Sequence, residues 1–217
     1  MPGSTTTLDE AITITSNKKQ ANAAPLGLCS FAMTTFVYSM YLIGIGGVTN
    51  TNVGLGLALF YGGSIQLLAG IFEMLRGDIF HGTIFSSYGG YWISFGFIHF
   101  EATGVVSSYK DNPVMLNNAL GIFLIGWTIF TIVMLLCVLK SNLVLITIIS
   151  LLIVINVCLT ISTFTGIRSF EVAAGVLGVI SAFLAWYLAL ASILNQVPCY
   201  FTLNTWPRVR TPIIEKV

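Results

Sequence analysis

Apolar residues fill most of the chain in six long blocks, which short polar stretches separate. Each block is long enough to cross the hydrocarbon core of a bilayer as a helix, which requires about 20 mostly apolar residues. Little chain remains between the blocks, so a separate soluble domain has no room. The pattern predicts an all-α integral membrane protein with six transmembrane helices, at residues 26–46, 53–75, 80–100, 116–139, 142–164 and 169–194.

Composition favours the same fold class. Of the 217 residues, 56% are hydrophobic and only 8% are charged, and the mean hydropathy is +0.91. A soluble domain of this composition would have too few charges to cover its surface. The net charge of +1 indicates neither a nucleic acid partner nor a strongly basic membrane-surface patch. We therefore expect the lipid bilayer as the surroundings of the protein.

Positive charges predict the orientation of the helices. On one side of the membrane lie Lys18, Lys19, Arg76, Lys140, Arg208, Arg210 and Lys216, and on the other side Lys110 and Arg168. By the positive-inside rule both termini are cytoplasmic. We expect a cytoplasmic tail over residues 1–21, a six-helix membrane domain over residues 22–194 and a second cytoplasmic tail over residues 195–217.

Small residues recur every seven positions in three of the blocks, which places each set on one stripe of its helix. The stripes are Gly56, Gly63 and Gly70, then Gly82, Gly89 and Gly96, then Gly175, Ala182 and Ala189. In lipid, small residues let helix backbones approach closely, so the stripes predict packing seams, with the second and third helices as a tight antiparallel pair. Two of the glycine pairs follow a tyrosine, in FYGGSIQ and SYGGYWI. There the glycines either pack closely or expose backbone carbonyls beside a cavity.

Polar groups inside the membrane are expensive unless they face other helices or water, so each one is a functional candidate. Glu73 lies near the end of the second block, where it either serves a substrate entrance or pairs with Arg76, three residues later. Gln66 lies on the same face, seven residues deeper. Asn156 and Thr34 either serve a substrate pathway or bond to neighbouring backbone.

Enzyme chemistry finds no support in the sequence. An intramembrane serine protease needs a nucleophile beside a base, yet both histidines flank the third block. A zinc site would need a cluster such as HExxH, which is missing. We therefore expect no metal and no cofactor. Transport or conduction is the favoured class, with a sensor or a structural membrane protein as the alternatives.

The segment NAAPLGL marks the start of the first helix. Pro25 suits a first helical turn because its missing N–H would be unbonded there anyway, and Asn22 is a good capping residue. A helix start carries unpaired N–H groups and about half a positive charge. At a pore mouth these groups could receive a carboxylate. The alternative is a capped helix start without a ligand.

The segments NAAPLGLCSFAMTTF, FYGGSIQLLAGIFE and SYGGYWISF are similar to the signatures of the acetate uptake transporter family (YaaH type). This family includes bacterial acetate and succinate permeases and fungal proteins linked to acetate transport and ammonia export. The resemblance runs from Asn22 to Ala191, and the segment NNALGIFLIGW adds to it. The family motif usually reads NPAPLGL, and Ala23 replaces its first proline here, which removes one rigid residue before the helix.

The resemblance implies a six-helix protomer with its own pore, assembled into a homo-hexamer, that carries acetate and sometimes succinate together with protons. It also implies a narrow apolar constriction, which the motifs match to Phe31 and Tyr88. The third member, Leu152, follows from an ungapped alignment that starts at Lys140. The predicted substrate pathway comprises Asn22, Pro25, Leu26, Gly27, Thr34, Gln66, Glu73, Gly89, Gly90, Trp92 and Asn156.

We therefore predict a plasma-membrane transporter of acetate and related short carboxylates, which is either coupled to protons or channel-like. An apolar constriction makes a carboxylate shed its water, which costs far more for the ion than for the neutral acid. Two alternatives stay open. One is a channel for small neutral solutes such as ammonia, urea or undissociated acetic acid. The other is a membrane sensor of acetic acid, in which binding changes the contacts of the tails without flux.

Overall fold

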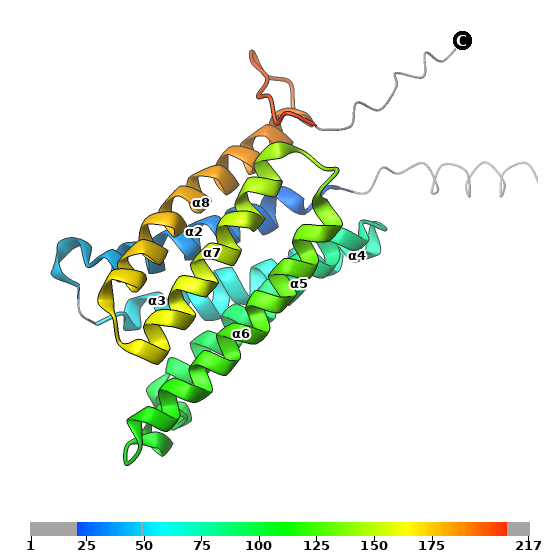
Figure 1. The fold of residues 1–217 in the computed structure, drawn as a ribbon. Coiled ribbons are helices and arrows are strands. Elements are labelled where there is room, and N and C mark those ends of the chain that lie inside the picture. The colour runs from blue at the N-terminus through cyan, green and yellow to red at the C-terminus, as the bar shows by residue number, and fades with distance from the viewer. Residues whose placement is uncertain (1–20, 49, 208–217) are drawn as a thin grey trace, which may run out of the picture.

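The computed structural model of the protein describes residues 21–48 and 50–207, and its regular secondary structure there is helical. Six long helical segments lie at the six predicted positions, each within three residues of the expected bounds (Figure 1). They are α2 (Ala24–Ile43), the continuous segment α3 (Asn52–Gly56), η2 (Leu57–Ile65) and α4 (Gln66–Leu75), then α5 (Ile79–His99), α6 (Pro113–Val138), α7 (Leu143–Thr165) and α8 (Arg168–Leu194). Short 3-10 turns, η1 (Ile45–Gly47), η3 (Glu101–Thr103) and η4 (Val106–Tyr109), lie in two of the connections.

Five of the six segments are long and apolar enough to cross a membrane by length and hydropathy alone, and α5 is the exception. With 21 residues, α5 is still long enough to span the hydrocarbon core. It carries histidines, serines, tyrosines and a tryptophan among its apolar residues, which lowers its hydropathy. Several of these side chains face the interior of the bundle, where lipid does not reach them.

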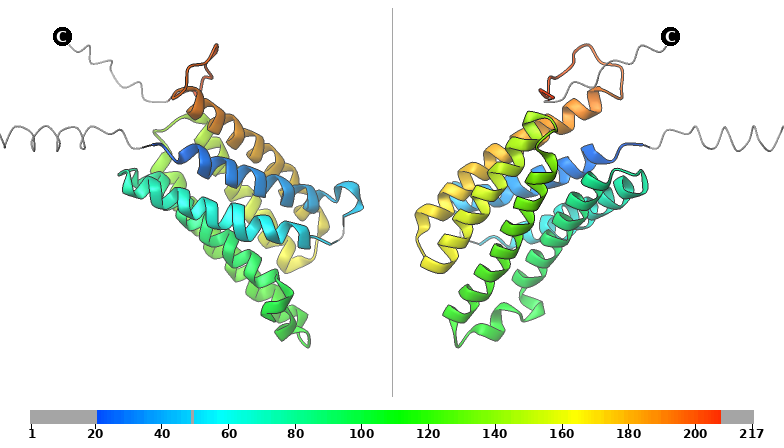
Figure 2. Two further views of the ribbon diagram at one scale, coloured as in Figure 1. Left: turned by 180° about the vertical axis from the view of Figure 1, so that it is seen from behind. Right: turned by 45° about the vertical axis from the view of Figure 1, so that its right-hand side comes forward.

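The helices form a ring. Helix α2 packs most extensively against α8, α8 packs against α7, and α7 packs against α6. On the other side of α2, the segments η2 and α4 contact both α2 and α5. Figures 1 and 2 show the start of α2 and the segment after α8 at the same end of the bundle. The described ends of the chain therefore lie on one side, and their cytoplasmic location remains a prediction.

The seam between the second and third helical segments is confirmed. A Cβ atom added at Gly89 of α5 would lie 2.6 Å from the backbone nitrogen of Leu67 in α4. One added at Gly82 would lie 2.9 Å from the backbone nitrogen of Met74. Only hydrogen fits between backbones this close, so the glycines permit the tight antiparallel pairing of α4 and α5.

The remaining stripes are confirmed except at one position. In the second segment, a Cβ added at Gly70 would meet the backbone of Ser86 in α5, and one added at Gly63 would meet the side chain of Ile93. Gly175 of α8 lies against α2, where an added Cβ would come within 2.8 Å of the Ser39 carbonyl oxygen, and Ala182 and Ala189 are buried. This stripe is therefore a seam between α8 and α2. Gly56, by contrast, has no atom within 4 Å of an added Cβ. It lies beyond the close contact, so its assignment to the seam was wrong.

The motif FYGGSIQ lies largely in a π-helix, η2, which the sequence did not predict. In a π-helix the backbone bonds from residue i to residue i+5, and such segments are rare and frequent at functional sites. The Ser64 hydroxyl follows the same spacing, because it donates to the Leu59 carbonyl oxygen at 2.8 Å. Gly62 faces α2, where an added Cβ would meet the side chain of Thr34. The wider turn thus sits where η2 touches α2.

Candidate functional site

A cavity of about 420 Å³ lies inside the ring of helices, between α2, α5, α6 and α7. Its outer end, which we call the mouth, lies where α2 and α5 end and α6 begins, near Leu42, His99 and Asn117. Its inner end lies near the middle of the helices. The cavity therefore opens at the end of the bundle opposite the described chain ends and extends about halfway through the bundle.

Phe31, Tyr88 and Leu152 close the inner end of the cavity, and we call these three residues the neck. Each is less than a tenth exposed, and the ring centroids of Phe31 and Tyr88 lie 6.5 Å apart. One helical turn further from the mouth, the same apolar core continues with Leu28, Phe85 and Ile148. The structure thus brings the three residues together, and their control of passage remains a prediction.

A small hydrogen-bonded group lies beside the neck. The Tyr88 hydroxyl and the Thr131 hydroxyl are 2.6 Å apart, and the Asn156 amide nitrogen donates to the Thr131 oxygen at 3.3 Å. The Thr131 hydroxyl also donates to the Trp127 carbonyl oxygen at 2.6 Å. Because the Thr131 hydroxyl donates its proton to that carbonyl oxygen, its oxygen accepts hydrogen bonds from both Tyr88 and Asn156. Asn156, which lines the cavity, keeps its amide oxygen and one N–H for other partners.

Thr131 is completely buried, and the sequence gave no reason to select it. A threonine inside an apolar helix usually bonds to its own backbone, and Thr131 does that as well. Its contact with Tyr88 depends on how α6 lies against α5. A pairwise signal between spans three and four, such as covariation, could have identified it.

Aromatic side chains hold α5 against α6 along one wall of the cavity. The rings of Tyr91 and Phe123 are stacked with centroids 5.8 Å apart, and Tyr88 stacks on Trp127 at the same distance. Tyr91 also meets Trp127 edge-on, at 5.1 Å. Such pairs each contribute about 0.5–1.5 kcal/mol beyond their buried area. This wall is therefore a rigid apolar surface next to the neck.

Few charges face the cavity. Among the described residues that line it, none is a lysine or an arginine, and the ionisable side chains other than tyrosine are His99 and Glu171, near the mouth. Glu171 is paired with Arg168 one turn earlier in α8. A carboxylate in the cavity would therefore depend on neutral hydrogen-bond donors.

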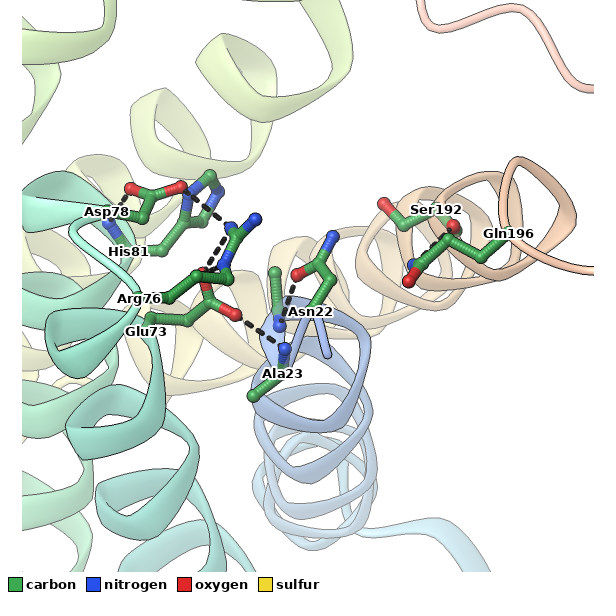
Figure 3. Close-up of polar contacts among 9 residues, drawn as sticks. Asn22, Ala23, Glu73, Arg76, Asp78, His81, Ser192 and Gln196 are labelled. Atoms are coloured by element: carbon green, nitrogen blue, oxygen red, sulfur yellow. Dashed lines mark hydrogen bonds and ion pairs between the residues drawn. The ribbon is translucent and has the colours of Figure 1, made fainter. Parts of the chain in front are cut away.

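A second polar cluster lies at the opposite end of the bundle, where α2 begins (Figure 3). Glu73 is completely buried, and its carboxylate accepts hydrogen bonds from Arg76, with Nε at 2.9 Å. The other carboxylate oxygen accepts the backbone N–H of Ala23. The ion pair predicted as one alternative for Glu73 is therefore present. The carboxylate that meets the start of α2 in this structure is the protein's own, and a role of Glu73 at a substrate entrance remains a prediction.

Asp78 extends this cluster across the turn between α4 and α5. Its carboxylate lies 3.2 Å from Arg76, 2.8 Å from the His81 ring nitrogen Nδ1 and 3.0 Å from the His81 backbone N–H, which it caps. Partial burial acts to raise the pKa of Asp78. The hydrogen bonds from His81 and the charges of His81 and Arg76 outweigh it, so the pKa of Asp78 lies below its ordinary value.

The predicted pathway residues of the first motif lie at the start of α2, where the Ala23 backbone N–H bonds to Glu73. Pro25 lies in the first turn of α2, as expected. The N-cap residue of α2 is Ala23 and not Asn22, and the Asn22 side chain accepts the backbone N–H of Ala24 at 2.9 Å from one position earlier. Leu26 is 40% exposed on the outside of the bundle. Gly27 lies against Phe85, whose ring carbons would be within 2.8 Å of an added Cβ.

Of the remaining predicted pathway residues, Trp92 and Asn156 line the cavity. Four others do not. Thr34 is completely buried and donates to the Ser30 carbonyl oxygen at 2.9 Å, and Gln66 is buried in the bundle. Gly89 lies in the seam with α4, and an added Cβ at Gly90 would have no neighbouring atom within 4 Å. The residues selected from the sequence motifs therefore lie in three different places: at the neck, in the helix-packing seams and at the start of α2.

Comparison with known sequences supports the resemblance seen in the motifs. The model of the GPR1/FUN34/yaaH family matches residues 4–208. Ammonia transport outward protein 2 of Saccharomyces cerevisiae is 45% identical over 186 residues, which make up 86% of this chain and 66% of that protein. The chain therefore spans about two thirds of the length of this relative. The succinate-acetate/proton symporter SatP of Escherichia coli is 34% identical over 182 residues, or 83% of this chain and 92% of the symporter.

Comparison with solved structures agrees with this. The structure of the bacterial acetate channel SatP is similar with a TM-score of 0.69 and 31% sequence identity, over 81% of this chain and 93% of the channel. The helical architecture and the hydropathy of the spans make the chain an all-α integral membrane protein. The likeness noted in its motifs is confirmed, and the chain belongs to the GPR1/FUN34/yaaH family.

Proposed function

We propose that this protein transports acetate and related short carboxylates, succinate among them, across the plasma membrane. Each protomer holds one pore, which runs from the cavity through the neck of Phe31, Tyr88 and Leu152 toward the cluster around Glu73. Six protomers form a homo-hexamer, and both termini are cytoplasmic. The names of the relatives support the substrate class, because one is called a succinate-acetate/proton symporter and another an acetate channel.

The observation that carries the proposal is a cavity that ends at three buried apolar side chains. Its volume is within the roughly 300–1,000 Å³ typical of small-molecule sites, so acetate enters it with water. The neck leaves no such room, and a carboxylate must lose water there. Desolvation costs several kcal/mol more for an ion than for a neutral acid. Passage is therefore easiest for acetic acid, or for acetate accompanied by a proton.

The free groups of Asn156 fit a carboxylic acid better than a carboxylate. Its amide oxygen accepts a hydrogen bond and its remaining N–H donates one, while the acid carries one donor and one acceptor. A carboxylate has acceptors only, so it would face the amide oxygen without a proton to share. The Tyr88 and Thr131 hydroxyls hold the amide in position. This arrangement supports coupling of the substrate to a proton at the neck.

A channel for small neutral solutes is the second candidate. The same apolar neck would admit ammonia, and the yeast relative at 45% identity is named for outward transport of ammonia. Ammonia needs no partner for a carboxyl group, so the hydrogen-bonded group at Asn156 would have no role in its passage. The two candidates therefore differ in their dependence on this residue.

Uptake of radiolabelled acetate by proteoliposomes, with and without an imposed pH gradient, tests the proposal. Empty liposomes give the background, because undissociated acetic acid crosses lipid by itself. Saturable uptake that depends on the gradient supports proton-coupled transport, and gradient-independent flux supports a channel. Flux of methylammonium without acetate flux would support the neutral-solute candidate. No flux above background would overturn transport and favour a sensor of acetic acid.

A further inference from the structure

The second membrane span leaves the α-helical register in the π-helix η2. The Gln66 backbone N–H, at the end of η2, donates to the Tyr61 carbonyl oxygen, five residues earlier. The Ser64 hydroxyl donates over the same interval to the Leu59 carbonyl oxygen. An α-helix bonds across four residues, so each turn of η2 holds about one additional residue. Most π-helical segments are single turns, whereas η2 runs over nine residues, which points to a role for its wider turns.

Glycine makes the wider turns possible and also weakens the α-helical alternative. A Cβ added at Gly63 would lie 2.5 Å from the Ala58 carbonyl oxygen, five residues earlier, so only glycine fits there. The pair Gly62 and Gly63 also lowers the stability of an α-helix, because glycine loses more conformational freedom on folding than other residues do. At the end of η2 the side-chain oxygen of Gln66 is buried without a partner among the described residues, which is costly. Neither register of η2 is therefore strongly stabilised.

The two neighbours of η2 are held by different kinds of contact. The backbone of α4 packs directly on that of α5 along the glycine seam, and Glu73 of α4 binds the Ala23 backbone N–H at the start of α2. Helix α3 rests instead on aromatic side chains, because a Cβ added at Gly54 would lie 3.0 Å from the rings of both Tyr38 and Tyr41. Side chains can rotate, whereas packed backbones cannot separate without loss of the seam. A change of register in η2 would therefore move α3 and leave α4 in place.

Helix α3 and η2 support one wall of the cavity. Tyr38 lines the cavity, and it forms a buried cluster with Ala58 of η2 and Trp92 of α5. Gly54 of α3 packs on the Tyr38 ring. Tyr38 therefore contacts both the cavity and the α3–η2 segment, and the position of its ring depends on that segment.

We propose that η2 is a conformational switch between π-helical and α-helical registers, which changes the width of the cavity between its mouth and the neck. When η2 takes the α-helical register, an additional residue passes into α3. Helix α3 then advances by about 1.5 Å and turns by about 100°. Gly54 leaves the Tyr38 ring, so the ring is free to move. The switch rests on the transport function proposed above, because the width of the cavity matters when a solute passes through it.

Distances between spin labels detect the two registers directly. A side chain lies about 5–6 Å from the helix axis, so a turn of about 100° moves it by about 8 Å. The labels are attached in Val53→Cys of α3 and Ile122→Cys of α6, both exposed positions, in a protein whose four native cysteines are replaced by serine. We expect pulsed electron paramagnetic resonance in lipid nanodiscs to give two distance populations for this pair. The matched pair Leu75→Cys of α4 and Ile122→Cys should give one population, because α4 does not move.

Ser64→Ala shifts the balance between the registers, because it removes a hydrogen bond that spans the five residues of the π form. Ser94→Ala is the matched control. The Ser94 hydroxyl is also exposed and donates at the same distance of 2.8 Å to the Gly90 carbonyl oxygen, four residues earlier in α5. Loss of one hydrogen bond changes an equilibrium by about twofold to tenfold. We expect the populations to shift by this factor toward the α-helical register in Ser64→Ala and to keep the wild-type ratio in Ser94→Ala.

Deletion of Phe60 removes the switch itself. Phe60 is exposed in η2, and with one residue fewer the segment can run as an α-helix while α3 and α4 keep their places. The labelled deletion variant should show one distance population, and its kcat for acetate uptake in proteoliposomes should fall by about tenfold or more. Should this variant fail to fold, the comparison of Ser64→Ala with Ser94→Ala decides the matter.

A single distance population for the labels at Val53 and Ile122 in the wild type, unchanged by added acetate and in Ser64→Ala, would overturn the switch. The π-helix would then be a fixed feature that fits η2 against α2. If the wild type transports no acetate, the transport function fails. In that case two populations whose ratio responds to Ser64→Ala would still support the switch.

Discussion

A methyl group added to Gly89 should force α4 and α5 apart, whereas one added to the adjacent Gly90 should not. The Cβ of Gly89→Ala would lie 2.6 Å from the backbone nitrogen of Leu67 and 2.8 Å from its Cα, both well inside van der Waals contact. Backbone atoms cannot move aside as a flexible side chain does, so the helices must separate. Overpacking of this kind costs about 1–3 kcal/mol. Replacing glycine by alanine inside a helix gains about 1 kcal/mol in propensity, which offsets part of that cost.

The matched variant Gly90→Ala isolates the clash. It carries the same gain in helix propensity on the same helix, and its added Cβ has no neighbour within 4 Å. The difference in unfolding free energy between the two variants should therefore be about 1–3 kcal/mol. For a chain of this length that corresponds to a Tm difference of roughly 2–12 °C. Circular dichroism of the purified variants in mild detergent measures it, and equal Tm values would show that the seam tolerates a side chain and that our reading of it is wrong.

Three further predictions concern the polar clusters. Glu73→Gln should lower the free energy of unfolding by about 1–3 kcal/mol, because it breaks a buried ion pair with Arg76. The cost is limited because the arginine is 29% exposed and keeps Asp78 as a partner. If Glu73→Gln and Arg76→Gln both have wild-type stability and Glu73→Gln alters the pH dependence of uptake, Glu73 instead belongs to a substrate entrance. Asp78 has a lowered pKa, so its stabilising contribution is complete above the ordinary value of 3.8 and is lost as pH falls below it. Melting curves of wild type and Asp78→Asn should therefore differ at pH 7 by less than about 1 kcal/mol and converge below pH ~4, and a gap that widens in acid would contradict this. Tyr88→Phe removes one partner of Thr131 and keeps the ring, so acetate uptake should weaken by about threefold to tenfold with little loss of stability, and unchanged uptake would show that the hydroxyl has no part in passage.

The sequence was sufficient for the positions and pairing of the helices. The bounds of the spans follow from long apolar blocks, and the seam at Gly82 and Gly89 follows from the seven-residue period of the glycines. Phe31 and Tyr88 could be selected only because their motifs resemble those of a known family. The spans and the seam depend on local patterns, which a single sequence carries.

The sequence was not sufficient to decide which face of an apolar helix points inward. Thr34 and Thr35 differ by about 100° on α2, and only Thr35 lines the cavity. A helix that is apolar all round gives no amphipathic signal from which to choose between them. The π-helix η2 has no sequence signature of its own, and Thr131 acquires its partner Tyr88 only through the packing of α6 on α5. Such tertiary features require the structure.

The neck at Phe31, Tyr88 and Leu152 is the central claim, and the substrate range of Leu152→Ala tests it most directly. Leu152 lines the cavity, whereas Ile148, one turn further from the mouth, is buried in the core and does not line it. Leu152→Ala removes about three methyl-sized groups from the neck, so uptake of lactate and succinate relative to acetate should rise by about tenfold in proteoliposomes. Ile148→Ala should leave this ratio at the wild-type value. An unchanged ratio in Leu152→Ala together with an increased ratio in Ile148→Ala would contradict the neck as assigned and place the constriction one helical turn deeper.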